Sequence, residues 1–183
     1  DASYKRETFV SRANNKIFTR YSCTGGTIDT KIAVQLHDPE TMASDTVIPR
    51  QENFSREDCS YFAAYNDSIY RPGDFGIVCR VFTDGETEPD GAYICVKGAR
   101  EILLVAEVFI ETDRSIGFAA ARQALDGVFD FEAELHKHAQ LHGELFRAVD
   151  FSIADTALYL DAYPKCGAAL KHFHQLVGIL AHL

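Results

Sequence analysis

The fold depends on one apolar stretch near the middle of the chain, Ile102-Leu103-Leu104-Val105-Ala106-Glu107-Val108-Phe109-Ile110. Only Glu107 interrupts this run of large and β-branched apolar residues. A strand with one solvated face alternates apolar and polar residues, whereas a strand covered on both faces is apolar almost throughout. The stretch therefore predicts a central β-strand with packed layers on both faces.

Shorter segments earlier in the chain also have the composition or the alternation of strands. They are residues 16–22, 28–36, 59–65, 75–82 and 92–96. The first two flank Thr24-Gly25-Gly26-Thr27, where glycine permits the positive φ of a tight turn. We therefore expect these two segments to pair as a β-hairpin.

The segments between the expected strands have the composition of loops and turns. Residues 38–56 are polar, contain proline and lack periodicity, so we expect a long surface loop. Residues 84–91 form an acidic connector rich in turn residues, and residues 97–100 predict a tight turn into the central strand.

After the central strand the spacing of apolar residues becomes helical. Residues 118–125 predict a short helix, and Asp130 is a suitable N-cap for a second one. Apolar and histidine side chains then recur at three- and four-residue steps, which predicts one face that docks on the strands. That stripe comprises Phe131, Leu135, His138, Leu141, His142, Leu145 and Val149. Residues 157–163 and 168–183 are also expected to be helical.

Strands followed by helices predict a mainly β fold, an antiparallel β-sandwich followed by linker helices. We expect a sandwich portion over residues 1–115 and a helical portion over 116–183. Asp1 is not an initiator, and an apolar helical pattern runs to Leu183 without a cap. Both ends therefore suggest a piece of a longer protein, with bare apolar faces that favour self-association.

Composition argues against several classes of partner. The net charge is -9 and Lys and Arg form no cluster, which disfavours nucleic acid and membrane surfaces. The 5 cysteines form no C-x-x-C pair, so neither a disulfide framework nor a zinc knuckle is expected. We predict a reducing, cytoplasmic location. The chain has no Trp, which counts against a free-standing sugar-binding module.

Three blocks of sequence resemble the N-terminal domain and linker of family 95 glycoside hydrolases, the α-L-fucosidases and their relatives. The first is Tyr4-Lys5-Arg6-Glu7-Thr8-Phe9-Val10-Ser11 with Ile17-Phe18-Thr19-Arg20. The second is Val96-Lys97-Gly98-Ala99-Arg100-Glu101 with Leu103-Leu104-Val105-Ala106. The third is His138-Ala139-Gln140-Leu141-His142-Gly143-Glu144-Leu145-Phe146-Arg147.

The resemblance implies a two-sheet supersandwich followed by linker helices that lead to an (α/α)₆ barrel. In that family the catalytic carboxylates lie in the barrel, which this chain lacks. The segment that normally precedes the first block is also missing, and residues 162–183 match the family only loosely. The resemblance therefore carries no catalytic residue onto this chain.

The residues themselves also predict no catalytic, cofactor-binding or metal site. Glu107 and Glu111 share one face of the expected strand but lie about 13 Å apart, too far for a pair that acts on one glycosidic bond. His138 and His142 have metal-ligand spacing on a helix, with Glu134 one turn earlier, but we expect a capping, interface or core hydrogen-bonding role instead. Gly25-Gly26 is not a phosphate loop, and residues 84–90 lack calcium-loop spacing.

We therefore predict an inactive fragment of a glycosidase, which the resemblance implies is α-L-fucosidase-like, with the catalytic barrel of that enzyme as its partner. Two alternatives stay open. The chain is a carbohydrate-binding β-sandwich module, or it is the N-terminal domain of a disaccharide phosphorylase, whose sandwich is similar.

Overall fold

The computed structural model describes residues 1–35, 50–70 and 72–147, nearly all within one compact unit, Asp1–Glu144. Its strands are β1 (Ser3–Val10), β2 (Ile17–Thr24), β3 (Ile28–Ile32), β4 (Glu52–Arg56), β5 (Cys59–Asn66), β6 (Gly73–Thr83), β7 (Glu86–Asp90), β8 (Tyr93–Ala99) and β9 (Glu101–Thr112). Its helices are α1 (Arg114–Ala124) and α2 (Phe131–Arg147).

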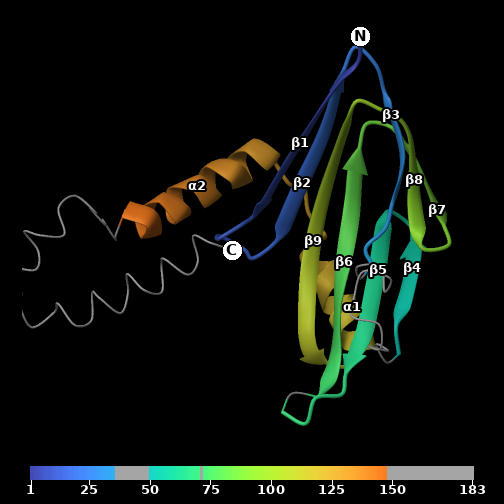
Figure 1. Ribbon diagram of the computed structural model, residues 1–183, viewed down its shortest axis with the longest axis vertical. Helices are drawn as coiled ribbons and strands as arrows, with labels where there is room; N and C mark the ends of the chain where they lie inside the picture. The colour runs from blue at the N-terminus through green and yellow to red at the C-terminus, as the bar shows by residue number, and fades with distance from the viewer. Residues whose placement is uncertain (36–49, 71, 148–183) are drawn as a thin grey trace, which may run out of the picture. The chain divides into compact units, whose positions relative to one another are not determined.

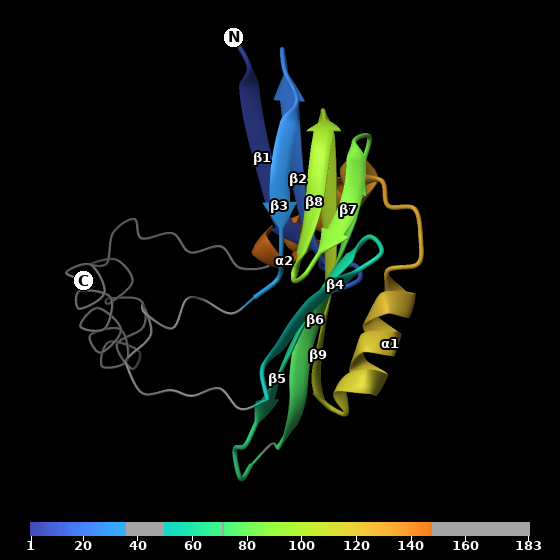
Figure 2. The ribbon, with the colours of Figure 1, turned by 90° about the vertical axis from the view of Figure 1, so that its right-hand side faces the viewer.

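The strands form two antiparallel sheets (Figure 1). The large sheet has six strands in the order β1-β2-β9-β6-β5-β4, and the small sheet has three in the order β3-β8-β7. One face of the large sheet carries the helices, and we call it the helix face. The other face meets the small sheet (Figure 2), and we call it the sandwich face. The expected antiparallel β-sandwich followed by helices is confirmed.

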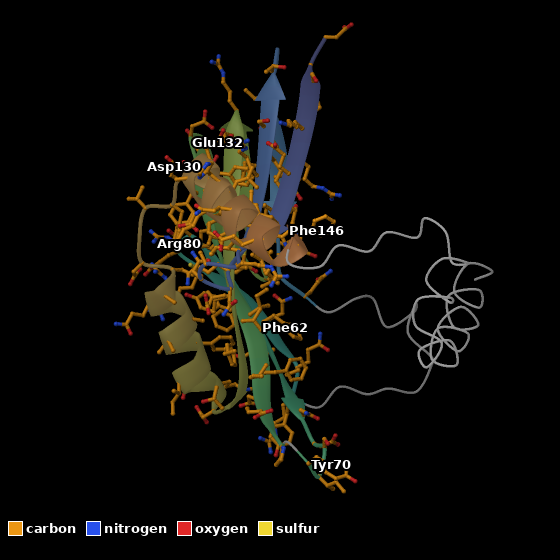
Figure 3. The ribbon with its side chains drawn as sticks, turned by 90° about the vertical axis from the view of Figure 1, so that its left-hand side faces the viewer. Phe62, Tyr70, Arg80, Asp130, Glu132 and Phe146 are labelled. Carbon is orange, nitrogen blue, oxygen red and sulfur yellow. The ribbon has the colours of Figure 1, made fainter. Side chains whose placement is uncertain are left out.

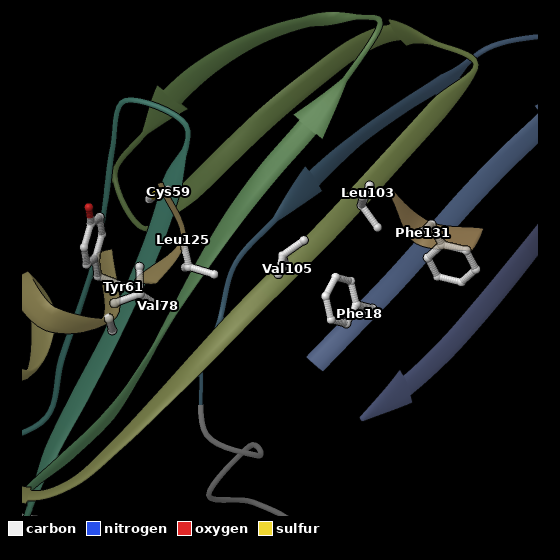
Figure 4. Close-up of a cluster of buried hydrophobic side chains, with 9 residues drawn as sticks. Phe18, Cys59, Tyr61, Val78, Leu103, Val105, Leu125 and Phe131 are labelled. Carbon is white, nitrogen blue, oxygen red and sulfur yellow. The ribbon is translucent and has the colours of Figure 1, made fainter. Parts of the chain in front are cut away.

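The central strand predicted at residues 102–110 is β9, which pairs with β2 on one side and β6 on the other. Leu103 and Val105 are buried in the core of the helix face, together with Phe18 (Figure 4). Ile102 is buried on the sandwich face, where Leu104 packs beside it. Because consecutive residues enter opposite cores, this part of β9 has no solvated face and its sequence is continuously apolar.

The expected hairpin between residues 16–22 and 28–36 is wrong. Both edges of β2 are occupied, by β1 and by β9, so β3 has no edge of β2 to pair with. The chain instead turns at Gly25, whose φ is +77°, and β3 pairs with β8 in the small sheet. The turn therefore links the two sheets rather than two neighbours in one sheet.

Two segments predicted as irregular contain strands. Glu52–Arg56, inside the expected loop 38–56, is the edge strand β4, and residues 38–49 of that loop lie outside the described part. The acidic connector contains β7, all of whose side chains are exposed. Backbone hydrogen bonds to β8 hold β7, so its pattern of side chains carries no strand signal.

The predicted tight turn at residues 97–100 is also corrected. Strand β8 continues to Ala99, and Gly98 has a φ of +68°. The register of β8 against β3 shifts here, from Val96 opposite Thr30 to Ala99 opposite Ile28. Gly98 thus serves a β-bulge, and the reversal into β9 falls at Arg100.

Each helix is held at its start by a carboxylate. Helix α1 begins four residues before its predicted start, where Asp113 accepts a hydrogen bond from the backbone N of Ser115 at 2.9 Å. Asp130 caps α2 as predicted, accepting from the backbone N of Ala133 at 3.0 Å. Figure 3 shows Asp130 and Glu132 at the start of α2.

The change from strand to helix falls between Thr112 and Arg114. The proposed division at residues 115 and 116 stays a prediction, and the compact unit itself extends to Glu144. The expected helices at 157–163 and 168–183 lie outside the described residues, as does Val149.

Candidate functional site: the seam between α2 and the β1–β2 hairpin

Helix α2 lies on the hairpin of β1 and β2, and side chains from both meet along one line. We call this contact the seam. Its hairpin side comprises Phe9, Arg12, Asn14, Phe18 and Arg20, and its helix side comprises Phe131, Glu132, Glu134, His138 and His142.

The apolar part of the seam is aromatic. Phe131 is only 5% exposed, and its ring meets that of Phe9 edge-on at 5.3 Å. Phe9 in turn stacks on Phe18 at 5.1 Å. Leu135 packs against the same cluster. The predicted docking of the helical stripe is thereby confirmed at Phe131 and Leu135.

Arg20 gives the seam its charged centre. Its guanidinium lies 4.0 Å above the Phe131 ring and contacts Glu7 of β1 at 2.6 Å and Glu132 of α2 at 2.8 Å. Burial works against its charge, but the hydrogen bonds to Glu7 and Glu132 raise the pKa of Arg20. Hydrogen bonds from Lys5 and then Arg20 lower the pKa of Glu7. The Arg20 guanidinium of β2 therefore links β1 to α2.

The two histidines belong to the seam, where each accepts a hydrogen bond from Arg12. The backbone N of Arg12 donates to Nδ1 of His138 at 3.4 Å, and Nε of Arg12 donates to Nδ1 of His142 at 3.2 Å. The imidazole rings stack at 5.6 Å, and that of His138 also lies 5.2 Å from Phe9. In the described part of the chain, no three His, Cys, Asp or Glu residues gather as metal ligands.

The turn that presents Arg12 is fixed by its own hydrogen bonds. Buried Ser11 donates its backbone N to the carbonyl of Lys16 at 2.8 Å, and its hydroxyl accepts from the backbone N of Ala13. Asn14 donates Nδ2 to Glu134 of α2 at 3.1 Å. Sequence reasoning missed Arg12 and Asn14, because neither residue has a local signal for contacts 120 to 130 positions away.

Glu107 and Glu111 do not form a catalytic pair. Glu107 points to the helix face and lies 2.9 Å from Nζ of Lys16, with both side chains largely covered. Glu111 lies in a β-bulge and has a φ of +56°, so the alternation that would place the two on one face is interrupted. The expectation that Glu107 and Glu111 share one face is therefore wrong.

A second charged cluster joins α1 to β5 and β6, and it is also structural. Arg80 donates to Asp58 at 2.7 Å and to the carbonyl of Leu125 at 2.8 Å, at the end of α1. The adjacent thiol of Cys59 is buried, and desolvation together with Asp58 raises its pKa to about 12. A thiol that stays protonated is a poor nucleophile, so this cluster does not support Cys chemistry.

The acidic residues of the connector serve turns and pairs. Oδ1 of Asp84 accepts from the backbone N of Arg100 and Glu101, at 2.8 and 3.0 Å. Asp90 pairs with Lys31 of β3 at 2.9 Å. These contacts place Asp84 in a turn, but residues 86–90 form the strand β7 rather than the predicted turn.

The three blocks of the resemblance thus occupy neighbouring elements. The first block forms β1 and part of β2, the second spans β8 and β9, and the third forms the second half of α2. No protein-family model and no curated protein matches this chain. Across residues 1–35, 50–70 and 72–147, no helix has the length and apolar character needed to cross a membrane.

Proposed function

We propose that this chain is a non-catalytic portion of a carbohydrate-active glycoside hydrolase, resembling the N-terminal sandwich and linker helix of family 95. The parent enzyme would be an α-L-fucosidase or a related exo-glycosidase. The observation that supports this proposal is the seam. Two sequence blocks more than a hundred residues apart resemble the same family, and they also contact one another through the rings of Phe9 and His138, 5.2 Å apart.

The proposed role of the unit is to hold its linker helix in one orientation. Four kinds of contact fix α2: aromatic packing at Phe131, the Arg20 pairs, the Asn14–Glu134 hydrogen bond and the Arg12–histidine bonds. A helix fixed in this way can position whatever follows it, here the catalytic barrel of the parent. The free thiols of Cys23, Cys59 and Cys79 support the further proposal of a cytoplasmic location.

The test compares two proteins, the full product of the open reading frame and the 183-residue chain alone. We expect the full product to hydrolyse an aryl α-L-fucoside and the chain alone to release no aryl alcohol. Cleavage that requires phosphate would favour the disaccharide phosphorylase alternative. Turnover by the chain alone that is lost in Glu107→Gln would contradict the non-catalytic assignment.

A further inference from the structure

Strand β1 is a free edge of the large sheet. It pairs with β2 on one side, and no strand in the described part of the chain pairs with its other side. Figure 1 shows β1 at the margin of the sheet, and α2 packs on the helix face of the hairpin, over Phe9 and Phe18. An unpaired edge presents backbone groups that another strand can join. Strand β1 is therefore a candidate surface for the addition of a strand.

The direction of the backbone groups of β1 follows from those of β2. The backbone N of Cys23 donates to the carbonyl of Arg100, so odd-numbered residues of β2 point their N–H and C=O groups at β9 and even-numbered ones point theirs at β1. Because Phe18 of β2 lies opposite Phe9, the odd-numbered residues of β1 make the bonds to β2. The even-numbered residues of β1 therefore point their N–H and C=O groups outward. They are Tyr4, Arg6, Thr8 and Val10.

The other sheet edges in the described residues are covered or irregular. On β4, the backbone N of Ser55 donates to the carbonyl of Gly91 at 2.8 Å. Strand β7 contains Pro89, which has no N–H, and β3 has a bulge between Ile28 and Thr30. Coverage, proline and bulges all prevent an edge from pairing further. Strand β1 has eight residues in regular register, with neither proline nor bulge.

We propose that β1 pairs with β1 of a second copy of this chain, antiparallel and around a two-fold axis at Arg6. Outward-pointing residues must lie opposite one another in such a pair. With the axis at Arg6, Arg6 lies opposite the partner's Arg6, and Tyr4 lies opposite the partner's Thr8. Each of these pairs exchanges two backbone hydrogen bonds, and the two large sheets become one continuous sheet. This pairing rests on β1 alone and is independent of the proposed glycosidase function.

The charges of β1 favour this register over its neighbours. Between the bonded pairs lie pairs without backbone bonds, at which the Cα atoms are closer, about 4.5 Å compared with about 5.5 Å. Lys5 lies opposite the partner's Glu7 at this close spacing, twice by symmetry. Nζ of Lys5 already lies 2.8 Å from Oε1 of Glu7 within one copy, so opposite charges would gather in one cluster. An axis at Lys5 or at Glu7 would instead place like charges at the close spacing, which is destabilising. The like pair at Arg6 has the wider spacing.

Sedimentation velocity of the 183-residue chain over a range of concentrations measures the dimer. The N–H of Thr8 points outward, so Thr8→Pro removes a donor to the partner and leaves the bonds to β2 in place. It should weaken dimerisation about tenfold or more. The matched control is Thr8→Val, which also loses the hydroxyl contact to Thr19 at 3.1 Å but keeps the N–H. This control should dimerise as the unmodified chain does, and thermal unfolding checks that both variants are folded.

Cross-linking under mild oxidation tests the register independently. Arg6→Cys should give a disulfide-linked dimer, since the two copies of residue 6 lie about 5.5 Å apart across the axis, within the range of a disulfide. Thr8→Cys is the control, because the two copies of residue 8 lie four positions apart along the ladder, or about 13 Å. It should cross-link no more than the unmodified chain, whose own 5 cysteines set the background.

Three results would overturn the proposal. The first is an unmodified chain that stays monomeric at every concentration. The second is equal dimerisation of folded Thr8→Pro and Thr8→Val. The third is cross-linking of Arg6→Cys that does not exceed that of Thr8→Cys, and this comparison decides the matter if Thr8→Pro fails to fold.

Discussion

Truncation of Phe131 tests how firmly α2 is held on the large sheet. The Phe131 side chain is 5% exposed, meets Phe9 edge-on at 5.3 Å and lies beneath the Arg20 guanidinium at 4.0 Å. Phe131→Ala removes the ring and leaves a cavity between helix and sheet. Such a change in a packed core costs about 3–5 kcal/mol. A typical domain is stable by only about 5–15 kcal/mol, so the effect should be large.

Urea unfolding followed by circular dichroism measures this loss. Lys137→Ala is the control, because Lys137 is exposed on the same helix and should change stability by less than about 0.5 kcal/mol. Phe131→Leu keeps most of the apolar volume but removes the ring under Arg20, so its loss should fall between the two. Equal, small effects of Phe131→Ala and Lys137→Ala would refute the docking of α2.

Three further predictions concern other parts of the unit. Because burial raises its pKa to about 12, Cys59 should resist a thiol reagent at pH 8 in the folded chain and react once urea unfolds it. A fast reaction in the folded chain that is absent from Cys59→Ser would contradict this. Arg114 donates to Asp74 and lowers the pKa of that carboxyl, so the pair stabilises the fold above the ordinary Asp pKa of about 3.9 and the effect is lost as pH falls through the lower, folded value. The stability gap between the parent chain and Asp74→Asn should therefore be largest near neutral pH and shrink in acid, and a gap independent of pH would count against the pair. Gly117→Ala should destabilise α1 although alanine favours helices, because a Cβ there would collide with the Phe109 ring; a gain in the thermal midpoint would show that the contact is loose.

The parts of the fold that could be predicted are those in which side chains carry the signal. Strand β9 is apolar from Ile102 to Ala106 because both its faces are buried there, and the start of α2 is marked by Asp130 and an apolar stripe. Strand β7 was not predicted, since its side chains are exposed and give no strand pattern, and only its backbone pairs with β8. The partner of β3 was predicted wrongly, because the sequence of the turn does not show that β1 and β9 pair with both edges of β2.

The seam, too, could be predicted only in part from the sequence. The stripe on α2 predicted that Phe131 and Leu135 would be covered, and the spacing of His138 and His142 singled them out. Nothing local to Arg12 or Asn14 indicates a partner on α2, since those partners lie 120 to 130 positions away in the sequence. Arg20, by contrast, lies in a block that resembles a known family, and that resemblance was the available signal.

The contact between the rings of Phe9 and His138 tests the central claim most directly, because it joins the first and third sequence blocks across the seam. The ring centroids lie 5.2 Å apart. A nuclear Overhauser experiment on the 183-residue chain, with assignments checked in Phe9→Leu, measures this proximity. We expect a cross-peak between the two rings that is retained in Lys137→Ala and lost in Phe131→Ala. A folded chain with both rings assigned and no cross-peak between them would contradict the docked seam.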